Sequence, residues 1–239
     1  MERKTEHPIL FSTPMVQAIM GLIKIMTRRT IGLEKINENP DAWIIVDTAN
    51  SLDGSNTIYF HFYNTILKES KYIKCPYGQK GDTLWVKEMY YAYGFWDKNG
   101  KTKTGKDKYS FDDLVTWDFP HQYHDNPPLR VNDKRDHPGW FKRSSLFMPR
   151  KASRILLEII NIRVERLQDI TEEDAKREGV FNVNPPSGFK NYLVNFELFV
   201  FAKASFRSLW CKINGDASWN ANPWVWVIEF KRIDYANRL

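Results

Sequence analysis

The chain has few cysteines. Cys75 and Cys211 are its only two, they lie far apart, and neither belongs to a C-x-x-C pair. No histidines stand near them at the spacing of a zinc site. This excludes a disulfide framework and gives no indication of a structural zinc ion. A chain with so few cysteines is expected in a reducing compartment.

Long apolar runs are missing as well. No window approaches the roughly 18 apolar residues that a membrane-spanning helix needs. The first residues, MERKTEHPILF, lack the apolar stretch of a signal peptide. We therefore expect a cytoplasmic protein with no membrane partner. Linkers rich in Gly, Ser or Pro are also missing, so we predict a single domain over residues 1–239.

What is present is the composition of a folded protein. Of the 239 residues, 42% are hydrophobic and 15% are aromatic, enough to bury a sizeable core. The formal net charge is +6, and the calculated isoelectric point is about 9.1. This balance modestly favours a polyanionic partner such as RNA. A basic surface that only keeps the protein soluble explains the same charge.

The stretch from Met15 to Arg29 joins a helical apolar pattern to a polar cluster. Its apolar residues recur at helical spacing and predict a helix whose last turn carries Lys24. Thr27 and Arg29 follow as the chain leaves that helix. The K-x-x-T-x-R spacing supplies an amine whose pKa burial can lower, a nucleophilic hydroxyl and a planar donor fork. The structural alternative is that a basic residue near a helix C-terminus only complements the helix dipole.

Runs of β-branched and aromatic residues predict the strands. Residues 7–12 indicate a short buried strand, and the runs 43–48 and 57–63 indicate a hairpin joined by turn-forming residues 51–56. Three longer strands, near 82–91, 155–165 and 223–232, are expected at the centre of the fold. The last is apolar on both faces, which is typical of an interior strand. With the helices, these strands predict an α+β fold.

Residues 96–146 show no sustained periodicity, and we interpret them as an insertion on the core fold. His121, His124 and Asp125 lie in this segment and are candidate metal ligands. One short segment supplies all three, however, and its surroundings resemble a surface loop. We therefore predict no metal site.

Two further helices are expected in the C-terminal half. Residues 169–179 have Thr171 as N-cap, acidic residues in the first turn and Gly179 as C-terminal stop. Glu178 therefore lies at the end of that helix, where the dipole either raises the pKa of its carboxyl group or requires a cationic neighbour. Residues 191–213 have helical period and predict a long packing helix.

In this order, these segments resemble the ASCH family of PUA-like domains, closest to its phage-encoded branch. The matching phrases are K-x-x-T-x-R, G-D-T-L-W-V at 81–86, F-M-P-R at 147–150, L-Q-D-I-T-E-E-D-A-K-R-E-G at 167–179 and N-P-W-V-W-V-I-E-F at 222–230. The resemblance implies a PUA-like mixed β-barrel flanked by helices, with 96–146 as a long insertion. It also implies a barrel cleft for RNA or a modified nucleoside.

Small bacterial members of this family are N4-acetylcytidine amidohydrolases that use a lysine, a threonine and a glutamate. Motif matching places these on Lys24, Thr27 and Glu178, with the arginine of the same motif on Arg29. Thr27 would attack the acyl carbon, Lys24 would accept its proton and Glu178 would protonate the leaving amine, with no cofactor. The family's glycine-basic pair before the lysine is Leu22-Ile23 here.

Two alternatives remain open from the sequence. In a binding module without catalysis, Lys24, Arg29 and Arg150 would hold phosphates, while Trp85 and Tyr90 would stack on a base. In a phage accessory or structural protein, the cleft would be unused. The catalytic interpretation predicts that Lys24, Thr27 and Glu178 converge in one pocket.

Overall fold

A computed structural model describes residues 4–51, 57–116, 120–132, 134–135, 137–183 and 188–233. The chain forms two compact units. Unit 1 comprises Met1–His7, Gln17–Leu84 and Ile155–Leu239, and unit 2 comprises Pro8–Val16 and Trp85–Arg154. The turn predicted at 51–56 lies almost wholly outside the described residues.

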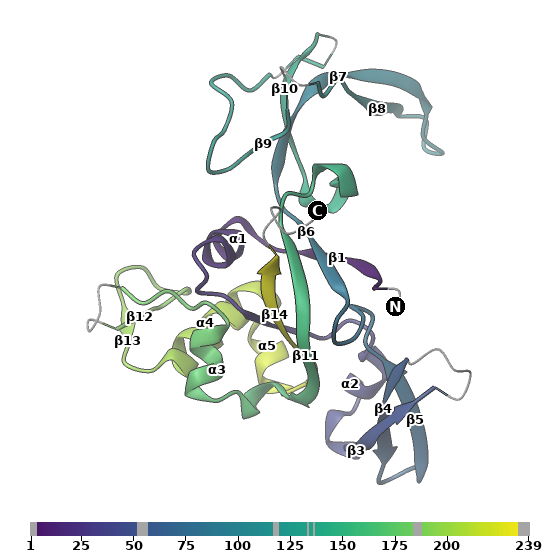
Figure 1. Cartoon of the computed structure of the whole chain (residues 1–239), viewed down its shortest axis with the longest axis vertical. Coiled ribbons are helices and arrows are strands. Elements are labelled where there is room, and N and C mark those ends of the chain that lie inside the picture. The colour runs from purple at the N-terminus through teal and green to yellow at the C-terminus, as the bar shows by residue number, and fades with distance from the viewer. Residues whose placement is uncertain are drawn as a thin grey trace. The chain divides into compact units, whose positions relative to one another are not determined.

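The described residues contain strands and helices in mixed order (Figure 1). The strands are β1 (Glu6–Leu10), β2 (Met26–Arg29), β3 (Trp43–Asn50), β4 (Ile58–Asn64), β5 (Glu69–Lys74), β6 (Thr83–Lys87), β7 (Tyr90–Lys101), β8 (Asp107–Asp113), β9 (Gln122–Tyr123), β10 (Gly139–Arg143), β11 (Leu156–Arg166), β12 (Phe189–Lys190), β13 (Leu198–Phe199) and β14 (Trp224–Ile233). The α-helices are α1 (Thr13–Met20), α2 (Glu34–Asn37), α3 (Glu172–Arg177), α4 (Ala202–Asn214) and α5 (Asp216–Asn220). Among the residues described, no helix is long and apolar enough to cross a membrane.

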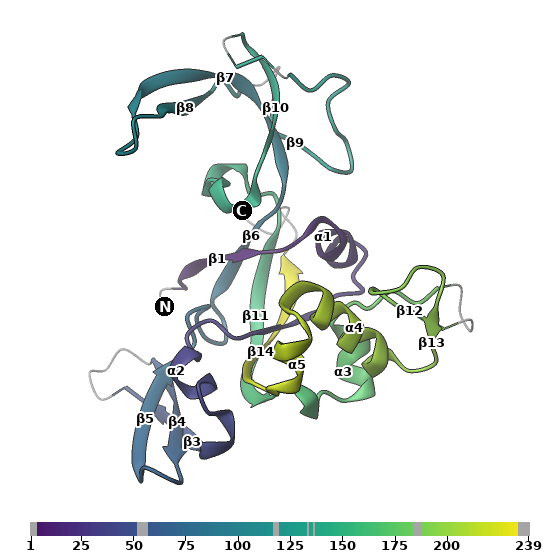
Figure 2. The same ribbon diagram turned by 180° about the vertical axis from the view of Figure 1, so that it is seen from behind.

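A five-stranded sheet with the order β1-β6-β11-β14-β2 is the main sheet of the fold. Strands β11 and β14 pair antiparallel along almost their whole length. Helices α3, α4 and α5 lie on one side of this pair, as both views show (Figures 1 and 2). Their buried side chains form one cluster with residues of β2 and β14, including Met26, Val225 and Val227. This helical layer holds α3 beside the edge strand β2.

The other face of β14 carries its tryptophans. Successive side chains of a strand point to opposite faces, so Trp224 and Trp226 point away from the valines. Their rings contact a second, three-stranded sheet with the order β3-β4-β5, where Phe62 and Phe60 lie 5.7 and 5.0 Å from Trp224 and Trp226 between ring centroids. Both faces of β14 are therefore covered, as its apolar sequence predicted.

Several sequence predictions are confirmed. The hairpin of β3 and β4, the strands β11 and β14 and the helix α3 all form where expected. The fold is mixed α+β and rich in strands. The five-stranded order ends in β1 and β2, and no closed barrel is found among the described residues.

Two predicted helices are wrong in part. The helix expected from residue 15 to Lys24 ends at Met20, because Gly21 and Leu22, which has a left-handed φ of 58°, interrupt it. The helix expected over 191–213 begins only at Ala202, and residues before it form the short hairpin β12–β13. The carboxylate of Glu172, distant in the sequence, accepts hydrogen bonds from the first backbone N–H groups of α4 and starts that helix.

Unit 2 has its own sheet, with β10-β7-β8 in order and β9 paired to β7. Its core cluster includes Tyr90, Ala92, Met148 and Ala152. Residues 96–146, which show no periodicity in the sequence, contribute β8, β9, β10 and much of β7 to this sheet. The strand expected near 82–91 is broken between Lys87 and Tyr90, so β6 and β7 are separate. The single domain over 1–239 with an insertion stays a prediction.

Candidate functional site

Lys24 and Glu178 meet in the interior of unit 1. Lys24 Nζ donates hydrogen bonds to Glu178 Oε2 at 2.6 Å and to the backbone oxygen of Glu178 at 2.7 Å. Lys24 is 2% exposed and Glu178 is 4% exposed. The structure therefore brings together two of the three predicted catalytic residues, although 154 positions separate them.

The loop between α1 and β2 positions Lys24. The backbone N–H groups of Ile23 and Lys24 both donate to the oxygen of Ala18, at 2.8 and 3.0 Å, which folds the loop back onto the end of α1. The N–H of Ile25 donates to the oxygen of Arg177 at 3.0 Å. The loop is thus joined to the end of α3, where Glu178 lies.

Helix α3 positions Glu178 through local signals. Thr171 Oγ1 accepts a hydrogen bond from the N–H of Asp174 at 3.1 Å, which caps the helix start. Gly179 ends the helix with a φ of 82°. A Cβ atom on Gly179 would lie 2.7 Å from Lys24 Cβ, so only glycine leaves room for Lys24 here. Glu178, at the unfavourable end of the dipole, has the cationic neighbour that this position requires.

Arg28 connects this pair to further carboxylates. Its Nη1 donates to Glu178 Oε1 at 3.2 Å, and its Nη2 donates to Asp174 Oδ2 at 3.0 Å. Its Nε and Nη2 also donate to Glu165 Oε1, the former at 3.1 Å. Three carboxylates from β11 and α3 therefore converge on one buried guanidinium group, so Arg28 links β2, β11 and the end of α3.

A second layer of ion pairs surrounds Arg28. Arg163 pairs with Glu165 at 3.0 Å, with Glu229 at 2.6 Å and with Asp174. Arg177 pairs with Glu229 at 2.6 Å. These groups form an alternating network of cations and anions, which keeps the carboxylates around Arg28 in fixed positions.

Thr27 and Arg29 lie on the other face of β2. In the register with β14, Thr27 is opposite Ile228, Arg28 opposite Val227 and Arg29 opposite Trp226. Alternation along the strand therefore points Thr27 and Arg29 away from Arg28. Thr27 is 3% exposed and lies in a strand, whereas the sequence placed it beyond a helix end. The hydrogen bonds given above join Lys24 to Glu178, and Thr27 Oγ1 takes no part in them.

Burial and neighbouring charges shift the pKa values of the basic groups. Burial lowers the pKa of the Lys24 amine from its ordinary 10.5. The charge and the hydrogen bond of Glu178 raise this pKa and so oppose the effect of burial, while the charges of Arg29 and Arg28 lower it further. Burial likewise lowers the pKa of Arg29. For Arg28, burial acts in the same direction, but Glu178, Glu165 and Asp174 outweigh it and raise its pKa. Lys24 is therefore the amine here that is shifted toward its neutral form.

The remaining predicted ligand residues, Trp85 and Arg150, belong to unit 2. Trp85 lies in β6, half-buried, with Lys87 Nζ 5.6 Å from its ring centroid. Arg150 is partly buried in a 3-10 helix, Arg150–Ala152. Tyr90, the other aromatic residue considered for base stacking, is buried and packs edge-on against His121. Its ring is therefore not open to a base in this conformation.

The candidate metal ligands make other contacts. His121 Nε2 lies 3.0 Å from Asp113 Oδ2, and Asp125 Oδ2 accepts a hydrogen bond from Arg154 at 2.8 Å. Across the described parts of the chain, no group of three His, Cys, Asp or Glu side chains is placed to hold a metal ion.

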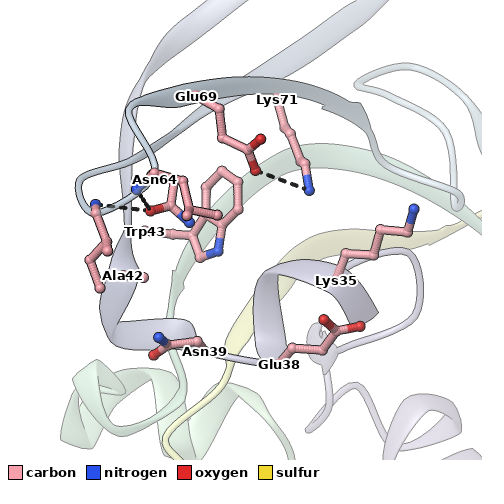
Figure 3. Close-up of a pocket in the computed structure, with 10 residues that line it drawn as sticks. Lys35, Glu38, Asn39, Ala42, Trp43, Asn64, Glu69 and Lys71 are labelled. Atoms are coloured by element: carbon pink, nitrogen blue, oxygen red, sulfur yellow. Dashed lines mark hydrogen bonds and ion pairs between the residues drawn. The ribbon is translucent and has the colours of Figure 1, made fainter.

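A cavity of about 420 Å³ lies elsewhere in unit 1, between α2 and the β3-β4-β5 sheet. Figure 3 shows Glu69 and Lys71 on one side, Lys35 and Glu38 on the other, and the indole of Trp43 between them. Lys71 Nζ lies 4.9 Å from the Trp43 ring centroid. The lining includes none of the predicted catalytic or ligand-binding residues, so this cavity does not extend the Lys24–Glu178 site.

Sequence reasoning missed Arg28 and its carboxylate partners. Some signals were present: Arg163 and Glu165 are two apart on a strand and so share a face, and Asp174 and Glu178 are four apart on a helix. Nothing in the local sequence, however, pairs Arg28 with residues at distances of 137 to 150 positions. Comparisons of the chain with protein-family models, with curated proteins and with solved structures gave no match.

Proposed function

We propose that this chain binds RNA or a modified nucleoside and hydrolyses an N-acylated cytidine-type amide at the Lys24–Glu178 site. The observation that carries the proposal is the buried contact of 2.6 Å between Lys24 Nζ and Glu178 Oε2, with the pKa of Lys24 lowered by burial. A lysine whose pKa is lowered, beside a carboxyl group, supplies a candidate base and a candidate acid in one place.

The burial of this pair favours function over simple structural support. Removing two charges from water costs about as much as their attraction returns, so a buried ion pair of this kind adds little to stability. A buried lysine whose pKa is shifted and that lies beside a charged partner is, in contrast, typical of catalytic sites. Arg28 and Arg29 both lower the pKa of Lys24 further, which suits an amine that must accept a proton.

The proposed reaction takes the roles of its residues from the family motif: the structure joins Lys24 to Glu178, while Thr27 lies on the face of β2 opposite to Arg28. Thr27 Oγ1 forms a bond to the acyl carbon and gives its proton to the neutral amine of Lys24. Lys24 passes this proton along its hydrogen bond to the carboxylate of Glu178, and Glu178 delivers it to the exocyclic amine as the C–N bond breaks. Water then cleaves the acyl-threonine ester and releases the carboxylic acid. Arg29 shares the face of Thr27 and supplies donors for the oxyanion.

The backbone at Leu22 supports the family resemblance on which this proposal draws. Leu22 is exposed and has a φ of 58°, a left-handed conformation that glycine adopts without strain. The ASCH motif has its glycine at this position. A left-handed residue at the position of the motif glycine supports the assignment of Lys24 as the motif lysine, on which the PUA-like interpretation of the sheet draws.

Hydrolysis of N4-acetylcytidine, as free nucleoside and within an RNA oligonucleotide, is the test. Lys24→Ala should abolish release of acetate, and Glu178→Gln should slow it by about 10²–10⁴-fold, the range for loss of a general acid. The matched controls are Lys176→Ala and Glu173→Gln, which remove an exposed lysine and an exposed glutamate of α3. Circular dichroism and thermal melting confirm that each variant is folded.

Activity that survives both Lys24→Ala and Glu178→Gln would contradict the catalytic role. If the wild-type chain binds the oligonucleotide but releases no acetate, it is a nucleic-acid-binding module without catalysis. If it neither binds nor hydrolyses at low salt, the whole proposal is wrong.

A further inference from the structure

The positive charge of the chain is concentrated in unit 2. Its two segments, 8–16 and 85–154, contain 14 Lys and Arg against 9 Asp and Glu, a formal net charge of +5. The whole chain carries +6, so the much longer unit 1 is nearly neutral. The basic isoelectric point is therefore a property of unit 2, while the Lys24–Glu178 pair lies in unit 1.

Within unit 2, the charge gathers on the β7–β8 hairpin. Residues 97–108 hold five lysines and two aspartates, and all twelve are exposed. Lys98 pairs with Asp107 at 2.9 Å. In the described parts of the chain, the other four lysines of this segment take part in no ion pair; they are Lys101, Lys103, Lys106 and Lys108. Figures 1 and 2 show the far end of this long hairpin away from β9 and β10.

Hydrogen bonds close the end of the hairpin. The N–H of Thr102 donates to the oxygen of Lys106 at 2.7 Å, and the N–H of Lys106 donates to Thr102 Oγ1 at 3.1 Å. The N–H of Gly105 donates to the oxygen of Thr102 at 2.9 Å. The lysines are thus presented on a closed turn, so a ligand that binds them does not have to order the backbone.

Aromatic rings and arginines fix the stem of the hairpin. Trp96 and Phe111 face each other across the two strands, and the guanidinium carbon of Arg143 lies 4.5 and 4.0 Å from their ring centroids. The guanidinium carbon of Arg135 lies 5.1 Å from the ring of Tyr109, and its backbone oxygen accepts from the N–H of Trp96 at 2.9 Å. Contacts of rings with guanidinium groups therefore join the two strands of the stem to its neighbouring segments.

We infer that the end of the β7–β8 hairpin binds the sugar-phosphate backbone of an RNA. Flexible ammonium groups on an exposed turn act as point charges for phosphates and do not read bases. This inference rests on the proposed function and deepens it: the substrate would be a nucleotide within a polymer, because a free nucleoside has no backbone phosphates for these lysines to contact.

Binding of a fluorescein-labelled single-stranded RNA of about 20 nucleotides, followed by anisotropy across a salt series, tests the inference. The variant K101Q/K103Q/K106Q/K108Q removes the four lysines. The slope of log affinity against log salt should fall by about 0.7 for every phosphate that is no longer neutralised, so by up to about 3 for all four. The affinity at low salt should fall at least about tenfold. The control K35Q/K74Q/K176Q/K212Q removes the same charge from exposed lysines of unit 1 and should keep most of the affinity.

A second measurement needs no variant. Wild-type protein is treated with an acetylating reagent with and without the RNA, and modification of each lysine is measured by mass spectrometry. The four hairpin lysines should be protected, and Lys35, Lys74, Lys176 and Lys212 should not. Equal loss of affinity in the two quadruple variants, or no protection of the hairpin, overturns the inference. So does binding to anionic vesicles without binding to RNA.

The outcome is separable from that of the proposed reaction. Release of acetate by the wild-type chain, from the free nucleoside or from the RNA oligonucleotide, decides only the catalytic proposal. Hydrolysis of the free nucleoside together with hairpin-independent RNA binding would leave that proposal standing and remove this inference. RNA binding that depends on the hairpin, without hydrolysis of any acetylcytidine, would support this inference and contradict the catalytic proposal.

Discussion

At the scale of single residues, Lys24 couples protonation to folding. Because burial lowers its pKa in the folded state, the unfolded chain binds this proton more tightly, so stability rises with pH between the lowered pKa and the ordinary 10.5. Burying charged Lys24 lowers the free energy of unfolding. This loss is fully present below the pKa of Lys24 in the folded state, and it disappears as the pH passes the ordinary pKa of 10.5. Urea unfolding at several pH values should therefore show that wild type gains stability relative to Lys24→Met as pH rises within this window.

The control for this measurement is Lys176→Met. Lys176 is half-exposed and pairs with an exposed glutamate on the same helix. The difference in free energy of unfolding between Lys176→Met and wild type should stay constant over the same pH range. A flat difference for Lys24→Met as well would mean that Lys24 has the same pKa in the folded and unfolded chain.

The backbone of Leu22, in the loop that carries Lys24, has a strained conformation. Its left-handed φ of 58° costs an L-residue about 1–2 kcal/mol, and its exposed side chain returns little. Leu22→Gly should raise the free energy of unfolding by about 0.5–1 kcal/mol, after the extra chain entropy of glycine is subtracted. Thermal melting measures the effect. Leu67→Gly, at an equally exposed leucine with an ordinary φ, should instead lower the melting temperature.

At the scale of elements, the end of α3 and the loop before β2 are built around Gly179. Alanine there would strain a φ of 82° and bring a Cβ to 2.7 Å from Lys24 Cβ in the buried site. We expect Gly179→Ala to cost about 2–4 kcal/mol, from backbone strain plus overpacking. The rate of acetate release should also fall in Gly179→Ala, because the new Cβ atom forces Lys24 to move.

Gly105 provides the comparison for this substitution. It has nearly the same φ, 80°, and a Cβ there would meet nothing within 4 Å. Gly105→Ala should therefore cost only the strain, about 1 kcal/mol. Equal losses of stability in the two variants, measured by urea unfolding, would show that contact with Lys24 contributes nothing.

At the scale of the whole molecule, the exposed hairpin of unit 2 should be the first site of proteolysis. Trypsin cleaves after lysine and arginine, and Lys101 to Lys108 stand on an exposed turn. Arg163 and Arg166 lie in β11, an interior strand of the five-stranded sheet. Mass spectrometry of early fragments should show cuts within 101–108 before any within 155–166. The reverse order would mean that β11 opens more readily than the hairpin end.

Local signals in the sequence determined a definite part of this structure. Strand β14 alternates valine and tryptophan, and it forms where predicted with both faces covered. Helix α3 has its cap at Thr171 and its stop at Gly179 because both depend on neighbours within one turn. The composition also indicated a folded protein, and runs of β-branched and aromatic residues predicted its strands. The alternation of β14 and the ends of α3 are patterns of residues close in the chain, so a single sequence displays them.

Only the tertiary structure decided the rest. The start of α4 depends on Glu172, 30 positions before the helix. The surroundings of Arg28 depend on three carboxylates more than 130 positions away. The pleat of β2 separates Thr27 and Arg29 from Arg28, and the chain between 96 and 146 builds a sheet in unit 2 without any periodic pattern. Burial and charge pairing act between residues that folding brings together, and their energies are invisible to local spacing.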